Sequence, residues 1–180
     1  MNREFYKRWV VVLILFGTFD TLTAASQDKF PVPTGNPNQL FYLQRTANTN
    51  TIICELNYND NVLDKEEPIH VFWIRYTDKG QKEELNFIQK KFAYGIKSTL
   101  ISPEKYELNF VSYKKFPMIL MKGTNNKYNV YGTINQKQAI INRIFVKING
   151  GSFWSPNVEY VEIKGVDPST GKEVIERRKI

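Results

Sequence analysis

The segment NPNQLFYLQRTANTNTIICELN, residues 36–57, decides the fold, because two strands of alternating apolar and polar residues flank an asparagine-rich turn. A four-residue turn over 47–50 would set Leu43 opposite Cys54 on the apolar face. Arg45 ends that face beside the turn, where its stem can cover apolar surface while its guanidinium reaches water. The segment therefore predicts an antiparallel hairpin with one buried face and an arginine at its edge.

The next strand, IHVFWIRYT at residues 69–77, carries apolar residues on both faces. Such a strand is typical of a central position in a sheet, or of one covered on its second side. It too ends one face on an arginine, since Arg75 follows Trp73 by two positions. The repeated pattern is the one indication that Arg45 and Arg75 converge.

The spacing of apolar residues changes from the strand-like period of two in KEELNFIQKKFAYGI, residues 82–96. Leu85, Ile88, Phe92 and Ile96 recur at helical spacing, which predicts one amphipathic helix near residues 82–95. Gly95 is expected to end that helix.

Short runs rich in aromatic and β-branched residues follow, separated by turn residues, at 106–113, 118–122, 128–134, 140–148, 158–164 and 173–178. Together with the earlier strands they give about nine antiparallel strands. We therefore expect a mainly β fold, a curved, partly closed sheet that is either barrel-like or a sandwich, with the helix packed on it. We expect a single β-rich domain over 40–180, preceded by a proline-rich extended lead-in at 26–39.

The first 25 residues have the three parts of a secretory signal peptide: a basic start, the apolar run WVVVLILF at 9–16, and small residues ending at Ala25. The apolar run is short for a membrane-spanning helix, although an uncleaved anchor is the alternative. We expect cleavage after Ala25, an exported protein that is periplasmic or extracellular, and no transmembrane segment in the mature chain.

The chain is basic, with a formal net charge of +7 from 25 Lys and Arg against 18 Asp and Glu. For an exported protein this favours an envelope glycan, a lipid headgroup or an acidic protein as partner over nucleic acid. A basic surface without a dedicated partner is the alternative.

Catalytic and metal-binding motifs are missing from the sequence. His70 is the one histidine and Cys54 the one cysteine, and both lie among apolar strand residues, which favours structural roles. The sequence has no zinc, calcium or phosphate-loop spacing and no nucleophile elbow, and KSTL at 97–100 reads as a loop. We therefore expect no catalytic residue, no metal and no cofactor, although paired carboxylates could still act on a glycan.

Aromatic and amide side chains offer a binding surface instead. Trp154 and Asn157 lie in FWSPNVEY at 153–160, and Tyr94 precedes Gly95. Aromatic rings and amides suit a sugar or another polar ligand, whereas a hydrophobic plug at the end of a sheet is the structural alternative. The candidate ligand-binding residues are Arg45, Arg75, Tyr94, Trp154 and Asn157, and we expect Arg75 and Trp154 to line one cavity.

Four segments together resemble one family of exported bacterial proteins: FPVPTGNPNQLFYLQRTANTNTIICELN, PIHVFWIRYTDKG, FAYGI and GGSFWSPNVEYVEIKG. The family is the domain of unknown function DUF4833, mostly from Bacteroidetes-type Gram-negative cells. The resemblance runs from about Phe30 to near the C-terminus. It implies a location in the cell envelope or outside the cytoplasm and implies no activity.

Three hypotheses for function follow. The first is a non-catalytic periplasmic or secreted binding domain for an envelope component or a small polar ligand. The second is a glycan hydrolase that uses two carboxylates, and the third is a structural or assembly subunit of the cell envelope that binds its partner through a strand edge.

Overall fold

The computed structural model describes residues 30–46, 48–152 and 155–179. The strands are β1 (Gln39–Arg45), β2 (Thr51–Leu56), β3 (Tyr58–Asn59), β4 (Val62–Leu63), β5 (Ile69–Arg75), β6 (Gln81–Glu84), β7 (Ile96–Ser102), β8 (Lys105–Phe110), β9 (Met118–Lys122), β10 (Tyr128–Ile134), β11 (Lys137–Gly151), β12 (Pro156–Val166) and β13 (Glu173–Lys179). The helical elements are a 3-10 turn (Tyr76–Asp78), α1 (Phe87–Gln89) and a π-helical turn (Lys90–Tyr94).

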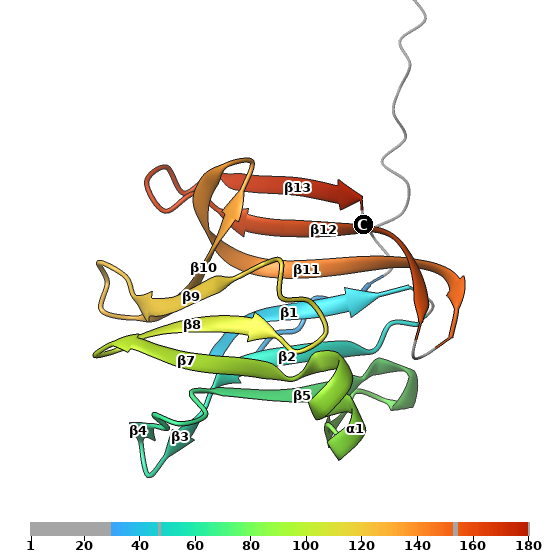
Figure 1. Ribbon diagram of the computed structural model, residues 1–180. Helices are drawn as coiled ribbons and strands as arrows, with labels where there is room; N and C mark the ends of the chain where they lie inside the picture. Colours follow the sequence, from blue (N-terminus) through green and yellow to red (C-terminus); the bar gives the residue numbers. More distant parts are fainter. Residues whose placement is uncertain (1–29, 47, 153–154, 180) are drawn as a thin grey trace, which may run out of the picture.

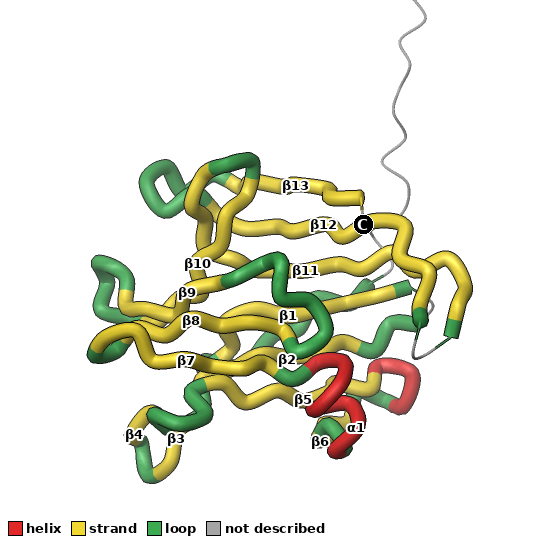
Figure 2. The backbone as a smooth tube through the Cα atoms, viewed as in Figure 1, coloured by secondary structure: helices red, strands yellow, loops and turns green. Residues whose placement is uncertain are grey.

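Eleven strands form one sheet in the order β6-β5-β2-β1-β11-β10-β9-β8-β7, with β12 and β13 continuing from β11. Long strand β11 is the junction, because β1 and β10 pair along one of its edges and β12 along the other. The two branches curl over each other, so that β7 and β8 lie in front of β1, β2 and β5 (Figure 1, Figure 2). The predicted mainly β, curved and partly closed sheet is thus confirmed.

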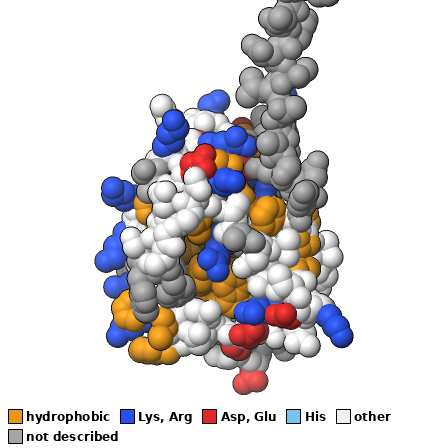
Figure 3. Space-filling view, turned by 90° about the vertical axis from the view of Figure 1, so that its right-hand side faces the viewer, with side chains coloured by type: hydrophobic (Ala, Val, Ile, Leu, Met, Phe, Trp, Pro, Cys, Tyr) orange, Lys and Arg blue, Asp and Glu red, His pale blue; other side chains and the backbone are white. Residues whose placement is uncertain are grey.

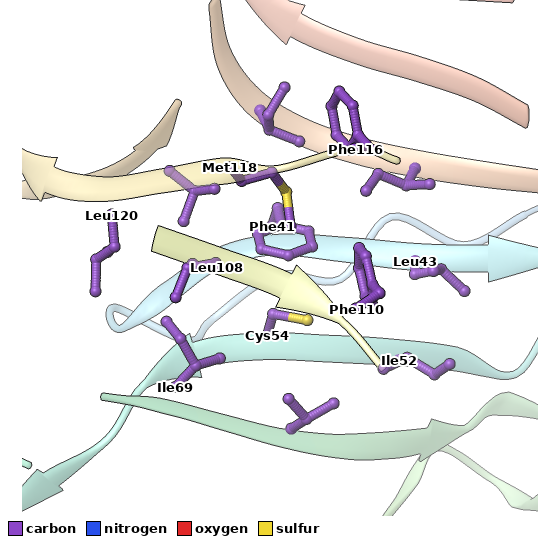
Figure 4. Close-up of a cluster of buried hydrophobic side chains, with 14 of the residues drawn as sticks. Phe41, Leu43, Ile52, Cys54, Ile69, Leu108, Phe110, Phe116, Met118 and Leu120 are labelled. Carbon is purple, nitrogen blue, oxygen red and sulfur yellow. The ribbon is translucent and has the colours of Figure 1, made fainter. Parts of the chain in front are cut away.

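The core fills the space between the two branches of the sheet. Alternate residues of β1 and β2 point inward, including Phe41 and Cys54, as the period-two pattern predicts. They meet Leu108 and Met118 from the opposite branch (Figure 4), and the rings of Phe41 and Phe110 pack edge to face with centroids 6.2 Å apart. Cys54 is fully buried, as expected, and burial raises the pKa of its thiol.

The first hairpin forms as predicted but in a different register. Leu43 lies opposite Ile52 instead of Cys54, a shift of two positions. A shift of two leaves every side chain on its original face, so the buried face is the predicted one. The connection between the strands is longer than expected because Thr46 bonds β11: its N–H donates to Val146 at 3.1 Å and its hydroxyl to Ile148 at 2.8 Å.

The predicted helix near 82–95 is confirmed over 87–94, where α1 and the π-helical turn lie, but it begins later than predicted. Lys82, Glu83 and Glu84 belong to strand β6, which pairs with β5, and helical geometry begins only at Phe87. Asn86 begins the helix with a capping box. Its side-chain oxygen accepts from the backbone N–H of Gln89 at 2.9 Å, and the side-chain oxygen of Gln89 accepts from the backbone N–H of Asn86 at 3.0 Å. The apolar stripe does not pack as a unit, because Leu85 is buried whereas Ile88 is 45% exposed.

Two further features differ from the sequence expectation. The segment KSTL, expected to be a loop, lies in strand β7 at the edge of the sheet. The pairing of β1 with β11 is parallel, whereas all the other strand pairs of the described residues are antiparallel.

The lead-in is bound to the outer face of the sheet through a buried polar network. Gln44 donates to the Pro31 carbonyl at 2.7 Å and accepts from Arg143 Nε at 2.8 Å. Arg143 lies 3.8 Å from Glu162, which also accepts from Arg177 Nε at 2.7 Å. Nowhere in the described part of the chain is a helix both long and apolar enough to cross a membrane.

Candidate functional site

A cavity of about 840 Å³ opens at the end of the molecule where β1 and β8 finish, and we call it the end cavity. Its walls come from β1, β11, β12, the π-helical turn and the segment after β8. Most lining residues are apolar, among them Leu43, Phe92, Phe110, Phe116, Ile144 and Val161. Figure 3 shows this end of the molecule, where hydrophobic side chains gather around a basic side chain near the middle of the face.

The end cavity is cationic as well as apolar. Its described lining residues include two arginines, Arg45 and Arg178, and no aspartate or glutamate. Arg178 is neutralised by Glu176, to which its Nε donates at 2.8 Å, and its Nη2 also donates to the Thr133 carbonyl at 2.8 Å. Its guanidinium lies over the Phe116 ring, 5.0 Å from the centroid. The charge of Arg178 is therefore balanced within the protein.

The charge of Arg45, in contrast, is not balanced by any carboxylate of the described residues. Its guanidinium carbon lies 5.9 Å from the ring centroids of both Trp73 and Tyr94, which is within cation–π range. Its buried Nε has no hydrogen-bond acceptor, and no carboxylate of the described residues forms an ion pair with it. Arg45 thus brings a positive charge without a counter-ion to the cavity wall.

The two rings beside Arg45 also pack on each other. Trp73 and Tyr94 meet edge to face with centroids 5.2 Å apart. Burial raises the pKa of the Tyr94 hydroxyl, and the nearby Arg45 charge partly opposes that shift. Trp73 is 4% exposed, and its buried Nε1 has no acceptor among the described residues. Two hydrogen-bond donors, Arg45 Nε and Trp73 Nε1, are therefore unsatisfied in one cluster.

The structure brings two of the sequence candidates together at the cavity and leaves the others elsewhere. Arg45 and Tyr94 line the end cavity, whereas Arg75 does not. Arg75 is bound instead to Asp78 at 3.1 Å and Glu83 at 3.6 Å, near the 3-10 turn. The convergence of Arg45 and Arg75 that the repeated strand pattern suggested is not a feature of this cavity.

The remaining two candidates lie in the connection between β11 and β12. Asn157 is exposed, and its amide donates to the Asn149 carbonyl at 3.1 Å across the start of that hairpin. Trp154 lies outside the described residues, so a cavity shared by Arg75 and Trp154 stays a prediction.

Sequence reasoning missed Arg178, Phe116 and the part played by Trp73. The sequence pattern predicts only a strand for EVIERR, residues 173–178, and only a turn for KKFP, residues 114–117. The alternation within β13 does place Arg178 on the same face as Val174, and Val174 packs against the core. That periodicity was the available signal, although it names no partner for the arginine.

A second pocket of about 1060 Å³ lies at the opposite end of the sheet, where β1 starts and β7 ends. Its lining includes Tyr58, Tyr106, Tyr128 and the ion pair between Lys122 and Glu104. Burial, together with Glu104 and the two neighbouring tyrosines, raises the pKa of Tyr128 to about 12. Lys122 and Glu104 balance each other's charge in this pocket, whereas Arg45 in the end cavity has no carboxylate partner among the described residues.

His70 lies on the outer face of the sheet and lines neither pocket. Its Nδ1 is 2.8 Å from Glu55 and its Nε2 is 2.8 Å from Glu84, so the ring bridges two strands. Neither pocket holds two carboxylates among its described lining residues, the arrangement that glycoside hydrolysis requires.

A family model described as "Domain of unknown function (DUF4833)" matches residues 41–177. No curated protein and no solved structure matches the chain.

Proposed function

Because the chain belongs to the DUF4833 family, a domain of unknown function, we propose its function from geometry: it is a non-catalytic binding domain whose end cavity holds a small, mostly apolar ligand. The observation that carries this proposal is an apolar cavity of about 840 Å³ formed by the sheet itself. Ligand sites are typically about 300–1,000 Å³, lined mainly by apolar and aromatic side chains with a few polar groups. The end cavity has this size and this composition.

The position of the cavity supports a binding role. The ends of curled or barrel-like sheets are common ligand sites, because the interior of the sheet is apolar and the loops leave an opening. Here β11 and β12 supply one wall through Val146 and Val158, and the segment around Phe92 supplies another. Phe92 is 51% exposed, so apolar surface is accessible at the opening.

Binding can be tested with an uncharged probe. We would titrate the full chain with N-phenylnaphthylamine, which fluoresces in apolar sites, and displace it with dodecanol. The expected result is saturable fluorescence, displacement by dodecanol and a raised unfolding midpoint, because a ligand at a hundred times its Kd adds about 2.7 kcal/mol.

A pair of matched variants would locate the bound probe. Val158→Trp fills the end cavity and is expected to abolish binding, whereas Val62→Trp, in the second pocket, is expected to leave it unchanged. Loss of binding in Val62→Trp alone would move the site to the second pocket, and no binding by the unmodified chain would refute the proposal.

A second candidate, an assembly subunit, rests on strand β7. This strand hydrogen-bonds only to β8 among the described strands, and it exposes 58% of Leu100 and 51% of Ile101. Free edges of this kind pair with another strand, here that of a second copy. Sedimentation velocity over a range of concentrations tests this, because a monomer at all concentrations would exclude self-assembly through β7.

We also propose that the binding domain acts outside the cytoplasm. The support is the signal-like sequence of residues 1–25, with its basic start, apolar run and small residues before Ser26. Mass spectrometry of the protein expressed with its own N-terminus in a Gram-negative host should find a chain beginning at Ser26. An intact N-terminus would contradict cleavage.

A further inference from the structure

We propose that the ligand of the end cavity is a single-chain amphiphile whose carboxylate head binds Arg45 while its apolar chain occupies the space between β8, β11 and β12. This inference rests on the proposed binding function and adds the chemical class of the ligand.

The charges of the described lining residues favour a ligand with one negative charge. Arg178 is paired with Glu176, whereas Arg45 has no carboxylate partner among the described residues. A cation that is partly removed from water keeps its charge at a cost unless an anion joins it. A ligand with a single negative charge would therefore bind best with its head at Arg45.

The unsatisfied donors point to the same place. The Nε of Arg45 and the Nε1 of Trp73 are both buried without an acceptor among the described residues, and the two side chains are in contact through the guanidinium and the indole ring. A guanidinium recognises a carboxylate through parallel N–H···O bonds, and these bonds are stronger where water is excluded. Of the two side chains, Arg45 lines the cavity, so it is the group that contacts the ligand.

The number of charges favours a carboxylate over a phosphate. A phosphate monoester carries roughly −1.5 to −2 charges near neutral pH, whereas a carboxylate carries one. Arg45 supplies one positive charge that no described carboxylate compensates, so a phosphate head would leave negative charge in an apolar cavity. The cavity thus matches a carboxylate in charge as well as in hydrogen-bonding geometry.

The rest of the wall fits an apolar chain. Beyond Arg45 the lining continues through Leu43 and Phe110 to Ile144 and Ile163, which are buried or nearly so. A chain placed there would remove its methylene groups from water, and these four side chains would contact it through apolar atoms alone.

The experiment compares three probes of equal chain length by isothermal titration: dodecanoate, dodecanol and dodecyl phosphate, all below their micelle concentrations. We expect dodecanoate to bind at least about tenfold more tightly than either of the others at neutral pH and low salt. The preference over dodecanol should shrink in high salt, because the ion pair is only partly shielded from solvent.

Matched variants identify the anchor. Arg45→Met should abolish the preference for dodecanoate over dodecanol while dodecanol binding persists, and Arg45→Lys should retain part of it. Arg75→Met is the control, since Arg75 is bound to Asp78 and Glu83 away from the cavity, and it should behave as the unmodified chain. A ¹³C label on the dodecanoate carboxyl adds a direct readout, because its pKa when bound should be lower beside Arg45 than in Arg45→Met.

The outcomes separate the two proposals. If dodecanol binds in the end cavity and dodecanoate binds no better, the binding function stands and the carboxylate inference is overturned. A preference that survives Arg45→Met overturns Arg45 as the anchor. Tighter binding of dodecyl phosphate overturns the argument from charge number, and failure of all three probes to bind overturns both proposals. Should Arg45→Met fail to fold, the salt dependence and the ¹³C titration of the unmodified chain decide the question.

Discussion

The Nε of Arg143 donates to the side-chain oxygen of Gln44 at 2.8 Å, joining two buried polar groups that lie 99 positions apart in the sequence. The bond crosses from β11 to its parallel neighbour β1 on the outer face of the sheet. The same Gln44 amide donates to the Pro31 carbonyl and to the Thr51 hydroxyl, at 2.7 and 3.0 Å. One amide therefore holds together the lead-in, two strands of the first hairpin and the junction strand.

The charge that balances this network is Glu162, and we expect Glu162→Gln to lower the free energy of unfolding by about 3 kcal/mol. The side chain is 3% exposed and faces both Arg143 and Arg177, so the amide would leave buried positive charge uncompensated. Urea unfolding at neutral pH measures the change. Glu104→Gln, which breaks the exposed pair with Lys122, is the control and should cost less than about 1 kcal/mol. Equal losses in the two variants would show that the network is not stabilised by its charge.

Gly95 permits the close approach of the chain to the carbonyl of Lys90. A Cβ on Gly95 would lie 2.0 Å from the Lys90 oxygen, so Gly95→Ala has to displace the backbone of the π-helical turn. We expect a loss of about 2 kcal/mol or more in thermal unfolding, together with weaker probe binding, because Tyr94 would move. Gly123→Ala is the control, since its Cβ would approach only side-chain atoms, at 3.0 Å. A Gly95→Ala protein as stable as Gly123→Ala would argue against strain at this position.

The contact between Glu55 and His70 should make stability depend on pH. Burial raises the pKa of the Glu55 carboxyl, but the hydrogen bonds from His70 and Asn36 and the Lys82 charge outweigh it, so the folded-state pKa is lowered. A lowered pKa contributes stability above the unfolded-state value, and this stability is lost as the pH falls through the folded-state value. Glu55→Gln should therefore be less stable than the unmodified chain at pH 7, with a gap that closes in acid. A gap that is constant from pH 7 to pH 3 would contradict this linkage.

The two arginines of the end cavity should differ in their effect on stability. Arg45 has no counter-ion in the part of the chain that the structure describes, so Arg45→Met should leave the free energy of unfolding unchanged or raise it by up to about 1 kcal/mol. Arg178→Met removes the pair with Glu176 and the bond to the Thr133 carbonyl, and a loss of about 1–2 kcal/mol is expected. Denaturation of both variants without ligand measures the difference. A larger loss in Arg45→Met would mean that its contacts with Trp73 and Tyr94 are structural, which would weaken the case for a ligand anchor.

Local alternation predicted much of the fold. Phe41 and Cys54 face the core because a period-two pattern fixes the face of a strand even when the register is two positions off. The start of the helix is predicted too early because Lys82, Glu83 and Glu84 are polar on both faces, as suits an edge strand, and such a stretch has no period of its own. The apolar spacing from Leu85 onward then dominated the prediction.

The candidate site could be predicted only in part. Arg45 stood out because it ends an apolar face, and Tyr94 because it precedes a helix-ending glycine. Arg178 and Phe116 reach the same cavity through the branching of the sheet at β11, which depends on pairings between distant segments. A local sequence pattern cannot reveal such pairings. It also cannot reveal that Arg75 forms an ion pair with Asp78 instead of reaching the cavity.

The parallel pairing of β1 with β11 has a consequence for how the chain reaches its native state. Thr46 and Ile148 form a hydrogen bond across 102 positions of sequence. Strand β1 is therefore synthesised long before β11, the strand that pairs with its second edge. At about 5–20 residues per second, synthesis alone imposes a delay of several seconds during which that edge is open. Sheets closed by such distant pairings fold slowly, on the order of milliseconds to seconds, since much chain entropy is lost before the contact forms. The nascent protein is thus a candidate for chaperone protection of β1 until β11 arrives.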